Sequence, residues 1–433
     1  MYIKSLKLQN FRNYADESFA FDPAVNLICG ENGQGKTNLL EAAAACSTMR
    51  LFRTAQKKEG LRFGENHAFI FADFVAQERD ISLELRFSRT KAMEIYKNGV
   101  RQKRQSDAQG LLKTVLFCPE DLMLVRAGAA ARRRFLDTAL CQMRPNYARY
   151  LEEYNRLHEH KTRILRDSEE KPSLLSMWED FSLRMAHIGA QIIRYRAYYC
   201  RKLLKAAAAV YADIAPHEVL SGVYKTVSSV TDPFADARTI EKQLIDHVFS
   251  HKTAEIAAKS CLSGPHKDDL ELLLDGRSAA SFGSQGQVRT CTLSLKLAER
   301  ELFFEPGKQA GADNRAAAVH NQHLARTTQN IGGQLPDLIF CPLAENQAAG
   351  IVITEVKHTD TFNLSVLKKS CVFHYTRQNA CCKEAKRLVR LKERPDWHQP
   401  DGCRIRRRLR CSKRHTAAAA ATLRLSQSSS MGM

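Results

Sequence analysis

The chain is predicted to have an α/β fold, on three observations. Residues 2 to 9 alternate between apolar and polar side chains, close to the period of a half-buried strand. A glycine-rich loop, residues 30 to 37, stands between an apolar run and a helical segment. A long helical stretch, from about residue 147 to 212, separates this region from a second one with strand character. A strand layer beside a nucleotide loop, with an inserted helical lobe, is therefore expected.

The glycine-rich loop fits the phosphate-binding pattern G-x-x-x-x-G-K-[ST]. It consists of Gly30, Glu31, Asn32, Gly33, Gln34, Gly35, Lys36 and Thr37. Its glycines allow backbone N–H groups to face phosphates, Lys36 would reach the β and γ oxygens, and the Thr37 hydroxyl would ligate Mg²⁺. The helix expected from Asn38 to Cys46 points its positive end at the same anion. The sequence thus predicts a P-loop NTPase site for ATP or GTP, with Thr37 as the metal ligand.

Strands and hairpins are expected on both sides of the lobe. Residues 69 to 75 and 81 to 87 alternate, and Asn98-Gly99 predicts a hairpin turn. After residue 215, Leu270, Leu272 and Leu274 alternate up to a second hairpin turn at Asp275-Gly276. A strongly helical segment then runs from Ser284 through Phe304.

The lobe itself is predicted as two antiparallel helices. Apolar stripes on either side of Lys171-Pro172-Ser173 indicate the two helices, with Ser173 as a candidate N-cap. These apolar residues are assigned to core packing. The charged face of the lobe would either contact DNA or be solvated, and composition favours a solvated face. Its residues are Arg156, Lys161, Arg163, Arg166 and Arg194.

A second anion site is predicted where the last helix begins. Ser284 and Gly286 stand at its N-terminus, where a hydroxyl and free amides point the same way. Two phosphate sites far apart in one chain suggest that two copies enclose the nucleotide between them. In that arrangement, Ser284 of one copy would reach the γ-phosphate held by the loop of the other. The sequence therefore predicts an ATP-dependent homodimer.

Composition places limits on partners and location. The formal net charge is +19; residues 1 to 304 hold 45 Lys and Arg against 37 Asp and Glu, and residues 305 to 433 hold 21 against 10. A mildly basic body fits either a nucleic-acid partner or a solvated surface. With no cationic leader or membrane-spanning run and no Cys-x-x-Cys pair, the chain is expected to be cytoplasmic, with its 13 cysteines reduced.

Six motifs together resemble the RecF family of bacterial DNA replication and repair proteins, over about residues 1 to 304. They are Phe11-Arg12-Asn13-Tyr14, Gly30 to Thr37, Phe117-Cys118-Pro119-Glu120-Asp121-Leu122, Arg132-Arg133-Arg134-Phe135-Leu136-Asp137, Gly264-Pro265-His266-Lys267-Asp268-Asp269-Leu270 and Ser284 to Arg289. The resemblance implies a P-loop ATPase head of the ABC and SMC type, with a helical lobe in place of a long coiled coil. It also implies ATP-dependent dimerisation, binding of double-stranded, gapped or single-stranded DNA, and loading of RecA onto single strands with RecO and RecR.

The resemblance also implies roles for single residues. Asn32 would lie near the γ-phosphate, and Arg12 would contact the nucleotide. Glu120 and Asp121 would couple the nucleotide to the lobe. For the run Arg132 to Arg134, DNA contact and structural ion pairing remain open. His266 is interpreted as a packed histidine at a Gly-Pro turn rather than as a catalytic group.

The family pattern ends near residue 304. There the family continues into a strand that ends in two acids, which hold Mg²⁺ and position the attacking water. This chain has Glu305-Pro306-Gly307-Lys308-Gln309 instead. Its nearest imitation is Ile351-Val352-Ile353-Thr354-Glu355, which is expected to lie too far from Ser284 in the sequence to be the same element. ATPase activity is thus expected from the family, while the residues for hydrolysis are missing and no catalytic residue is assigned.

Three alternatives follow for the function. The chain is an active ATPase, an ATP-gated DNA clamp without hydrolysis, or a non-functional frameshifted product; a small-molecule P-loop kinase is disfavoured by the lobe and the Ser284 turn. The predicted domains are a discontinuous ATP-binding head, 1–145 plus 215–304, a helical lobe, 146–214, and a basic tail, 305–433. The tail is either a nucleic-acid-binding segment or out-of-frame translation, and its composition favours the second.

Overall fold

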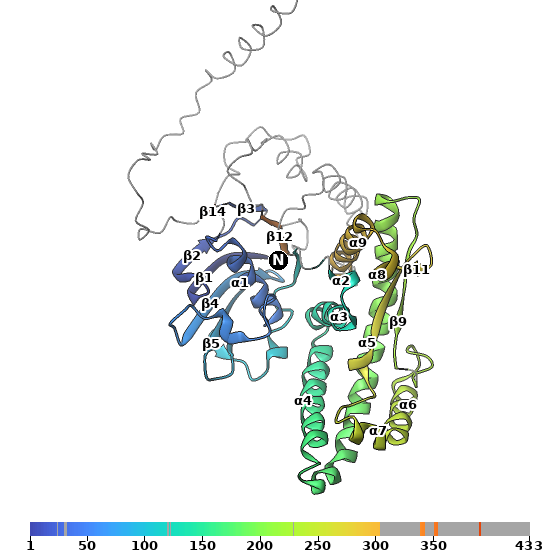
Figure 1. Cartoon of the computed structure of the whole chain (residues 1–433). Coiled ribbons are helices and arrows are strands. Elements are labelled where there is room, and N and C mark those ends of the chain that lie inside the picture. The colour runs from blue at the N-terminus through green and yellow to red at the C-terminus, as the bar shows by residue number, and fades with distance from the viewer. Residues whose placement is uncertain are drawn as a thin grey trace, which may run out of the picture. The chain divides into compact units, whose positions relative to one another are not determined.

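The computed structural model describes residues 1–23, 25–29, 33–118, 121, 123–227 and 229–303, together with three short strands further along the chain. The first six-stranded sheet is antiparallel throughout, in the order β2-β1-β4-β5-β6-β7 (Figure 1). Its strands are β1 Tyr2–Phe11, β2 Tyr14–Ala20, β4 His67–Ala76, β5 Arg79–Ser88, β6 Glu94–Lys97 and β7 Val100–Arg101.

The predicted alternation and turn of this sheet are observed. The inward side chains of β1, such as Leu6 and Leu8, are fully buried. Asn98 and Gly99 join β6 to β7 with φ values of 48° and 76°, the left-handed pair that a tight hairpin requires. The buried face packs with helix α1, Lys36–Thr48, into one hydrophobic core.

The phosphate-loop strand lies in a second, five-stranded sheet, in the order β14-β3-β13-β12-β8. Its strands are β3 Val25–Cys29, β8 Thr114–Phe117, β12 Leu338–Pro342, β13 Gly350–Ile353 and β14 Val389–Arg390. β13 pairs with β3 in parallel, Val352 opposite Leu27, so both strands end at the edge where the phosphate loop begins. The Ile351 to Glu355 segment thus supplies a strand beside β3, although Thr354 and Glu355 lie outside the described residues.

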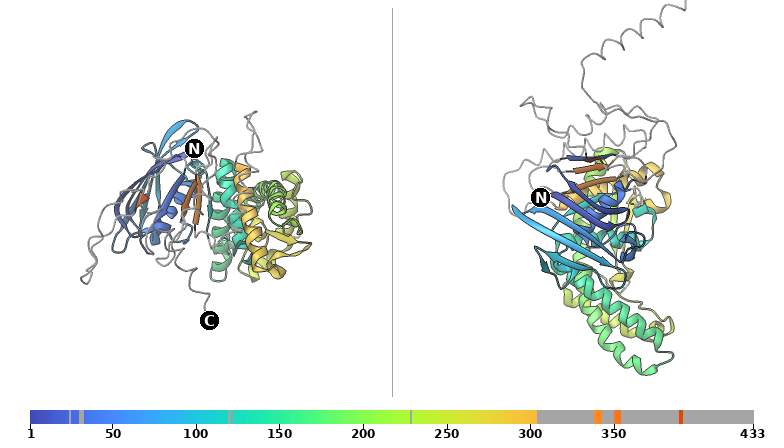
Figure 2. Two further views of the ribbon diagram at one scale, coloured as in Figure 1. Left: turned by 90° about the horizontal axis from the view of Figure 1, so that it is seen from above. Right: turned by 90° about the vertical axis from the view of Figure 1, so that its left-hand side faces the viewer.

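A second core contains the helices and a three-stranded sheet. The helices are α2 Met123–Arg126, α3 Ala129–Met143, α4 Pro145–Asp167, α5 Trp178–Ile214, α6 Ala237–Ser250, α7 Lys252–Ala257, α8 Ala279–Phe282 and α9 Gln285–Phe303. The sheet has the order β11-β10-β9, with β9 Leu220–Lys225, β10 Asp269–Leu274 and β11 Arg277–Ser278. α4 and α5 lie side by side as the expected hairpin (Figure 2).

One predicted helix boundary is wrong. Ser173 is expected to cap the second lobe helix, but it lies inside a 3₁₀ turn, Pro172–Met177, and its carbonyl accepts a bond from the Ser176 hydroxyl. The proline fixes φ at the start of that turn, so helical geometry begins before Ser173 and α5 continues from Trp178.

The packing groups segments differently from the domain division expected from the sequence. Apolar residues of β9, β10 and α9, such as Leu220, Leu272 and Leu295, share a core with α4 and α5 rather than with the antiparallel sheet. The division at residues 145 and 215 therefore stays a prediction. In the described part of the chain, no helix is long and apolar enough to cross a membrane.

Candidate functional site

The phosphate loop enters α1 through two glycines in left-handed conformations. Gly33 has φ of 82° and Gly35 has φ of 106°, a region that other residues adopt only with strain. Gly35 is also the N-cap of α1, and within the described chain no side chain caps the first turn. Lys36 is buried and Thr37 half-buried as the first two helical residues. The backbone N–H groups of this first turn therefore suit an anion. Gly30, Glu31 and Asn32 lie outside the described residues.

The turn between β1 and β2 braces the loop from one side. The Asn13 side-chain amide donates to the carbonyl of Gln34 (3.0 Å), and the Tyr14 hydroxyl donates to the carbonyl of Gly35 (3.0 Å). Asn38 in α1 donates to the Asn13 side-chain oxygen at 2.7 Å. A Cβ on Gly35 would lie 2.6 Å from Asn13 and 2.9 Å from the Tyr14 hydroxyl. Only glycine fits here, because the brace occupies the space of a side chain.

A buried carboxylate joins two arginines beside the loop. Glu41 in α1 is fully buried and accepts from Arg12 in a bidentate pair, at 2.8 and 3.1 Å. Arg53 donates to the same carboxylate from its side chain (3.0 Å) and from its backbone (3.2 Å). One negative charge thus faces two positive ones, so the cluster is net positive. Arg12, predicted to contact the nucleotide, lies near the loop but is held by Glu41.

The second predicted anion turn is built as a capping box. The Gln287 N–H donates to the Ser284 hydroxyl oxygen at 3.2 Å, while the Ser284 N–H donates to the Gln287 side-chain oxygen at 2.8 Å. Gln287 also donates to Glu218, at 2.8 Å. Ser284 and Gly286 are exposed, and a Cβ on Gly286 would meet only the Ser284 hydroxyl, at 3.9 Å. The turn is rigid, and its outer side is open to another molecule.

The structure brings some predicted site residues together and separates others. Arg12, Gly33 to Gly35, Lys36 and Thr37 gather around the start of α1, which belongs to the core of the antiparallel sheet. Ser284 and Gly286 start α9, whose Val288, Cys291 and Leu295 belong to the core of the lobe. The two anion turns are therefore carried by two different hydrophobic cores.

A largely covered lysine, with 11% of its side chain exposed, joins α9 to the segment after β8. Lys296 pairs with Asp121 at 3.3 Å and with Glu299 at 3.6 Å. Burial opposes its charge, but the two carboxylates hold the pKa of Lys296 above its usual value. Burial raises the pKa of Glu299 to about 7. Asp121, predicted to couple nucleotide and lobe, thus contacts the helix that carries Ser284. Glu120 lies outside the described residues.

The arginine run after β8 divides into inward and outward residues. Arg132 makes a bidentate pair with Asp269, at 2.7 and 2.8 Å, and Arg133 donates to the carbonyl of Asp268 at 2.6 Å. Arg134 is exposed. The first two therefore favour the structural alternative, because their guanidinium groups tie α3 to β10.

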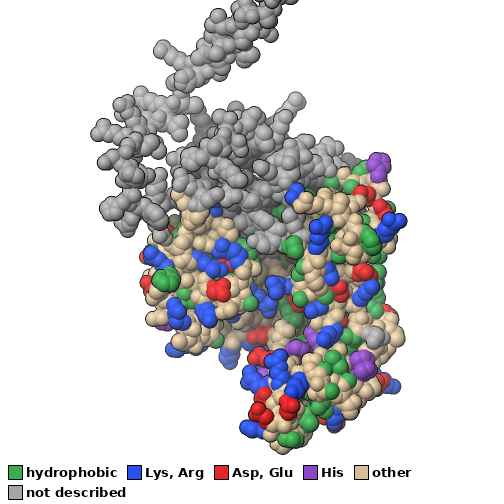
Figure 3. Space-filling model, in the orientation of Figure 1, with side chains coloured by type: hydrophobic (Ala, Val, Ile, Leu, Met, Phe, Trp, Pro, Cys, Tyr) green, Lys and Arg blue, Asp and Glu red, His purple; other side chains and the backbone are tan. Residues whose placement is uncertain are grey.

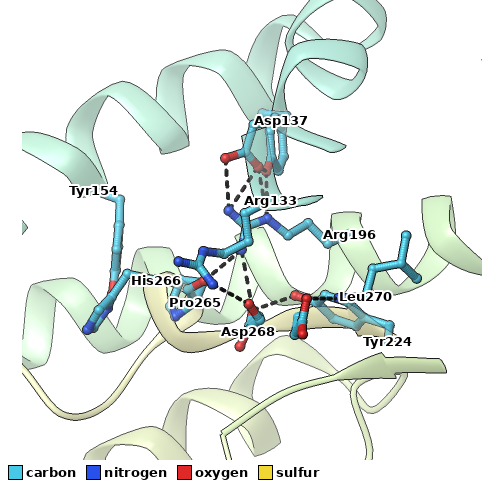
Figure 4. Close-up of polar contacts among 11 residues, drawn as sticks. Arg133, Asp137, Tyr154, Arg196, Tyr224, Pro265, His266, Asp268 and Leu270 are labelled. Atoms are coloured by element: carbon cyan, nitrogen blue, oxygen red, sulfur yellow. Dashed lines mark hydrogen bonds and ion pairs between the residues drawn. The ribbon is translucent and has the colours of Figure 1, made fainter. Parts of the chain in front are cut away.

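A buried network around Arg196 fixes the Gly264 to Leu270 segment (Figure 4). Arg196 of α5 donates to both oxygens of Asp137 at 2.9 and 3.0 Å, and to the carbonyl of Pro265 at 2.7 Å. Tyr224 donates to Asp268, whose pKa burial raises to about 6. The segment is thereby locked onto α3 and α5.

His266 belongs to the same segment. Its Nδ1 accepts from the Tyr154 hydroxyl at 2.8 Å, and its Nε2–H donates to the carbonyl of Cys261 at 3.1 Å. Burial lowers the pKa of His266 to about 3. Both ring nitrogens are used within the fold, which agrees with the interpretation as a packed histidine.

The lobe's charged face mixes both signs. Figure 3 shows Lys and Arg side chains interspersed with Asp and Glu over the molecule. Arg156, Arg163 and Arg166 are exposed, and Arg163 pairs weakly with Glu159, at 3.5 Å. Lys161 is not part of that surface: it is 1% exposed and pairs with buried Glu255 at 2.6 Å. Helical periodicity places it correctly on α4 but cannot reveal that Glu255 covers it.

Sequence reasoning misses the brace and the ion-pair cluster. From the sequence, Asn13 and Tyr14 stand out only as members of a motif, and nothing distinguishes Glu41 or Arg53. Their partners lie 12 to 29 positions away, so no local period links them. The one available signal is an acid on the otherwise apolar face of the helix after the loop, because a buried carboxylate needs a cation.

Comparison with known proteins agrees with this architecture. Residues 5–169 match a family model described as an AAA domain. The DNA replication and repair protein RecF of Acetivibrio thermocellus is 32% identical over 303 residues, 70% of this chain and 82% of that protein. RecF of Lactobacillus johnsonii is 35% identical over 307 residues, again 70% and 82%.

Solved structures give the same result. The structure of the recombination mediator protein RecF-ATP in the RecFOR pathway superimposes with a TM-score of 0.70 at 26% identity, covering 83% of this chain and 93% of that one. Its RecF-ATPrS counterpart gives 0.67, also at 26% identity, covering 82% and 93%. The predicted fold class is confirmed as a P-loop ATPase fold, and the chain belongs to the RecF family of DNA replication and repair proteins.

Proposed function

We propose that this chain is an ATP-dependent DNA-binding protein of recombinational repair. It binds ATP at the loop from Gly30 to Thr37, with Mg²⁺ on the Thr37 hydroxyl, and engages double-stranded, gapped or single-stranded DNA. With RecO and RecR it helps to load RecA onto single strands. The solved relative RecF-ATP is a recombination mediator protein in the RecFOR pathway, which supports both the nucleotide and the pathway proposed for this chain.

The observation that carries the proposal is the pair of anion turns on two cores. The braced loop offers uncapped N–H groups and Lys36, while the Ser284 turn is exposed, rigid and carried by the other core. A nucleotide bound on the loop of one copy would present its γ-phosphate to Ser284 of a second copy. ATP then acts as part of the dimer interface.

Sedimentation of the full chain with and without ATP and Mg²⁺ tests this arrangement. We expect ATP to produce a dimer, Lys36→Ala to lose nucleotide binding, and Ser284→Arg to keep nucleotide binding while remaining monomeric. Ala209→Arg, at an exposed position of α5, is the matched control and should still dimerise. Dimerisation of Ser284→Arg as strong as that of the parent would contradict the shared site.

A clamp that binds ATP without cleaving it is the second candidate. It is favoured because β13, the strand parallel to β3, is followed in the sequence by Thr354 and Glu355, a single acid where the family has two. An ATPase and a clamp that only binds ATP are distinguished by measuring steady-state phosphate release on DNA and nucleotide binding with the same preparation. Turnover that Lys36→Ala abolishes would exclude the clamp.

We also propose that residues 305–433 are not a selected domain but the product of a shifted reading frame. The curated relatives match 70% of this chain, and the family pattern in the sequence ends near residue 304. Translating the other two frames beyond codon 304 tests this. Absence of a Leu-Asp-Asp pattern from both frames would refute the proposal.

A further inference from the structure

A cavity of about 430 Å³ lies among α3, α5 and α9, apart from both anion turns. This volume is within the range of about 300–1,000 Å³ typical of small-molecule sites. Its long wall is one stripe of α5, with residues three or four positions apart. The stripe consists of Gln191, Arg194, Tyr195, Tyr198, Tyr199 and Lys202. The last turns of α3 and α9 close the other side through Met143 and Leu302.

The composition of this stripe is unusual for a helix that packs against two others. Such a stripe is normally aliphatic, whereas this one presents three tyrosine rings and two cations, and Arg144 adds a third cation from the end of α3. None of the described lining residues is acidic. The cavity therefore combines flat aromatic surfaces with positive charge.

Two polar groups in the wall have no partner within the described chain. Tyr199 is 5% exposed, yet its hydroxyl is buried and makes no hydrogen bond. Arg194 is half-buried, and its Nε is likewise buried without an acceptor. A buried donor left unpaired costs free energy, so such groups indicate a missing acceptor. Both can donate to a phosphate or carbonyl oxygen. Burial and the carboxylate of Glu299 raise the pKa of Tyr199, and the Glu299 Oε2, which is also buried without a hydrogen bond, is a competing acceptor for the Tyr199 hydroxyl.

We propose that this cavity binds one nucleotide unit, with its base against the tyrosine rings and its phosphate on Arg194, Arg144 and Lys202. Tyr198 is 39% exposed; Phe234 packs edge-to-face against its ring at 5.4 Å and the Arg201 guanidinium lies over the ring at 5.0 Å, so a base would use the ring surface that these two groups leave exposed. Bases stack on aromatic side chains without regard to sequence, and Arg and Lys neutralise the adjoining phosphate. The unit belongs either to a free nucleotide or to a nucleic-acid strand, which share this chemistry.

The competing explanation for the cations is purely structural. α3 ends at Met143 and α9 at Phe303, and helix C-termini attract positive side chains. In that explanation, the positive charge of Arg194 would interact with the negative C-terminal ends of α3 and α9 and would contact no ligand. It does not explain the unpaired Tyr199 hydroxyl, which a helix dipole leaves unsatisfied.

The test uses the full chain carrying Lys36→Ala, without ATP, so that the phosphate loop does not contribute. The probe is a short fluorescein-labelled oligothymidylate measured by anisotropy, with dTMP as the competitor. We expect Arg194→Gln to weaken binding about tenfold and Tyr199→Phe about threefold. Lys205→Gln removes one charge from an exposed position of α5 outside the cavity and should change binding less than about twofold.

Tyr199→Phe keeps the inference testable if a charge variant misfolds, because removing an unpaired buried hydroxyl should not lower the melting temperature. Competition by dTMP identifies a free-nucleotide site, and binding of the strand without such competition identifies a nucleic-acid site. The proposal is overturned if neither probe binds, or if Arg194→Gln and Tyr199→Phe bind like Lys205→Gln. A fall in melting temperature of Arg194→Gln at unchanged affinity would support the structural account instead. Because ATP and Lys36 are absent from the assay, its failure leaves the proposed ATP site unaffected.

Discussion

The Tyr14 hydroxyl is a single group on which the shape of the phosphate loop depends. It is buried and donates to the Gly35 carbonyl at the point where the loop becomes α1. Tyr14→Phe removes that donor and leaves the carbonyl without it. We expect ATP to bind about threefold to tenfold more weakly, with a small change in melting temperature, since one neutral hydrogen bond contributes about 0.5–1.5 kcal/mol.

Isothermal titration with ATP measures this effect. The matched control is Tyr96→Phe in β6 of the same sheet; among the described residues, the Tyr96 hydroxyl bonds to the side chains of Arg86 and Glu94, which also belong to this sheet. Equal ATP affinity for the two variants would mean that the loop holds its shape without the brace.

Half-buried His266 and buried Asp268, both in the Gly264 to Leu270 segment, should give opposite pH dependences of stability. The pKa of His266 is lowered to about 3 by burial. As the pH falls below about 6.5, the unfolded chain binds a proton that the folded chain refuses, so stability decreases. The pKa of Asp268 is raised to about 6, again by burial. The stabilisation that the raised pKa of Asp268 gives to the folded state is complete below about pH 3.9 and is lost as the pH rises through 6.

His266→Gln isolates the first of these effects. We expect the melting temperature of this variant to fall less steeply than that of the parent between pH 6.5 and 4, because the unfavourable protonation is gone. The exposed His217→Gln serves as the control and should follow the parent. Parallel curves for all three proteins would argue against a depressed His266 pKa.

Among the elements, α3 connects the two cores through one buried amide. The Gln142 side-chain oxygen accepts from the Ser47 hydroxyl of α1 at 2.7 Å and from the N–H of Thr114 in β8 at 2.8 Å. All three residues are buried. Gln142→Leu fills the space but leaves two donors unpaired. We expect the free energy of unfolding to fall by about 2–4 kcal/mol, since each buried donor without an acceptor costs about 1–3 kcal/mol.

Urea denaturation followed by circular dichroism measures that loss. Adding Ser47→Ala to Gln142→Leu removes the unpaired Ser47 hydroxyl. The double variant should recover part of the lost stability, because replacing both partners of a hydrogen bond by apolar groups is nearly neutral. If the double variant is no more stable than Gln142→Leu, the amide does not act as the connector.

The elements also show where sequence reasoning reaches and where it stops. The strands, the two hairpin turns, the α4–α5 hairpin and the Ser284 cap depend on local period and local turn chemistry, and these are predictable. The predicted Ser173 cap is wrong because a proline one position earlier starts a different turn. The brace by Asn13 and the cover over Lys161 depend on partners distant in sequence, which no local pattern encodes.

At the scale of the whole molecule, an altered C-terminal third should affect the stability of the fold more than any other property. If residues 305–433 are out of frame, the strands β12, β13 and β14, which pair with β8 and β3 in the five-stranded sheet, come from chain that was not selected for that position. Their packing beside β3 and β8 would then be poor, and a low melting temperature is expected. A frame-corrected chain, compared by differential scanning calorimetry, should melt several degrees higher. A cooperative transition of the present chain at ordinary mesophilic temperatures, about 45–65 °C, would contradict this expectation.

The brace on the phosphate loop affects what remains of the nucleotide site when the C-terminal part of the chain is altered. Asn13 and Tyr14 belong to the antiparallel sheet, whose strands all lie within the first 101 residues. The end of the loop that enters α1 is therefore braced by chain that is made first, while β3, the strand that leads into the loop, pairs with β13 and β14 from the C-terminal third. A gene damaged late in its length would then still encode a nucleotide-sized cradle. Such a product could bind ATP or form a dimer with an intact copy. It would then compete with intact copies of the protein, which is a different effect from the loss of the protein.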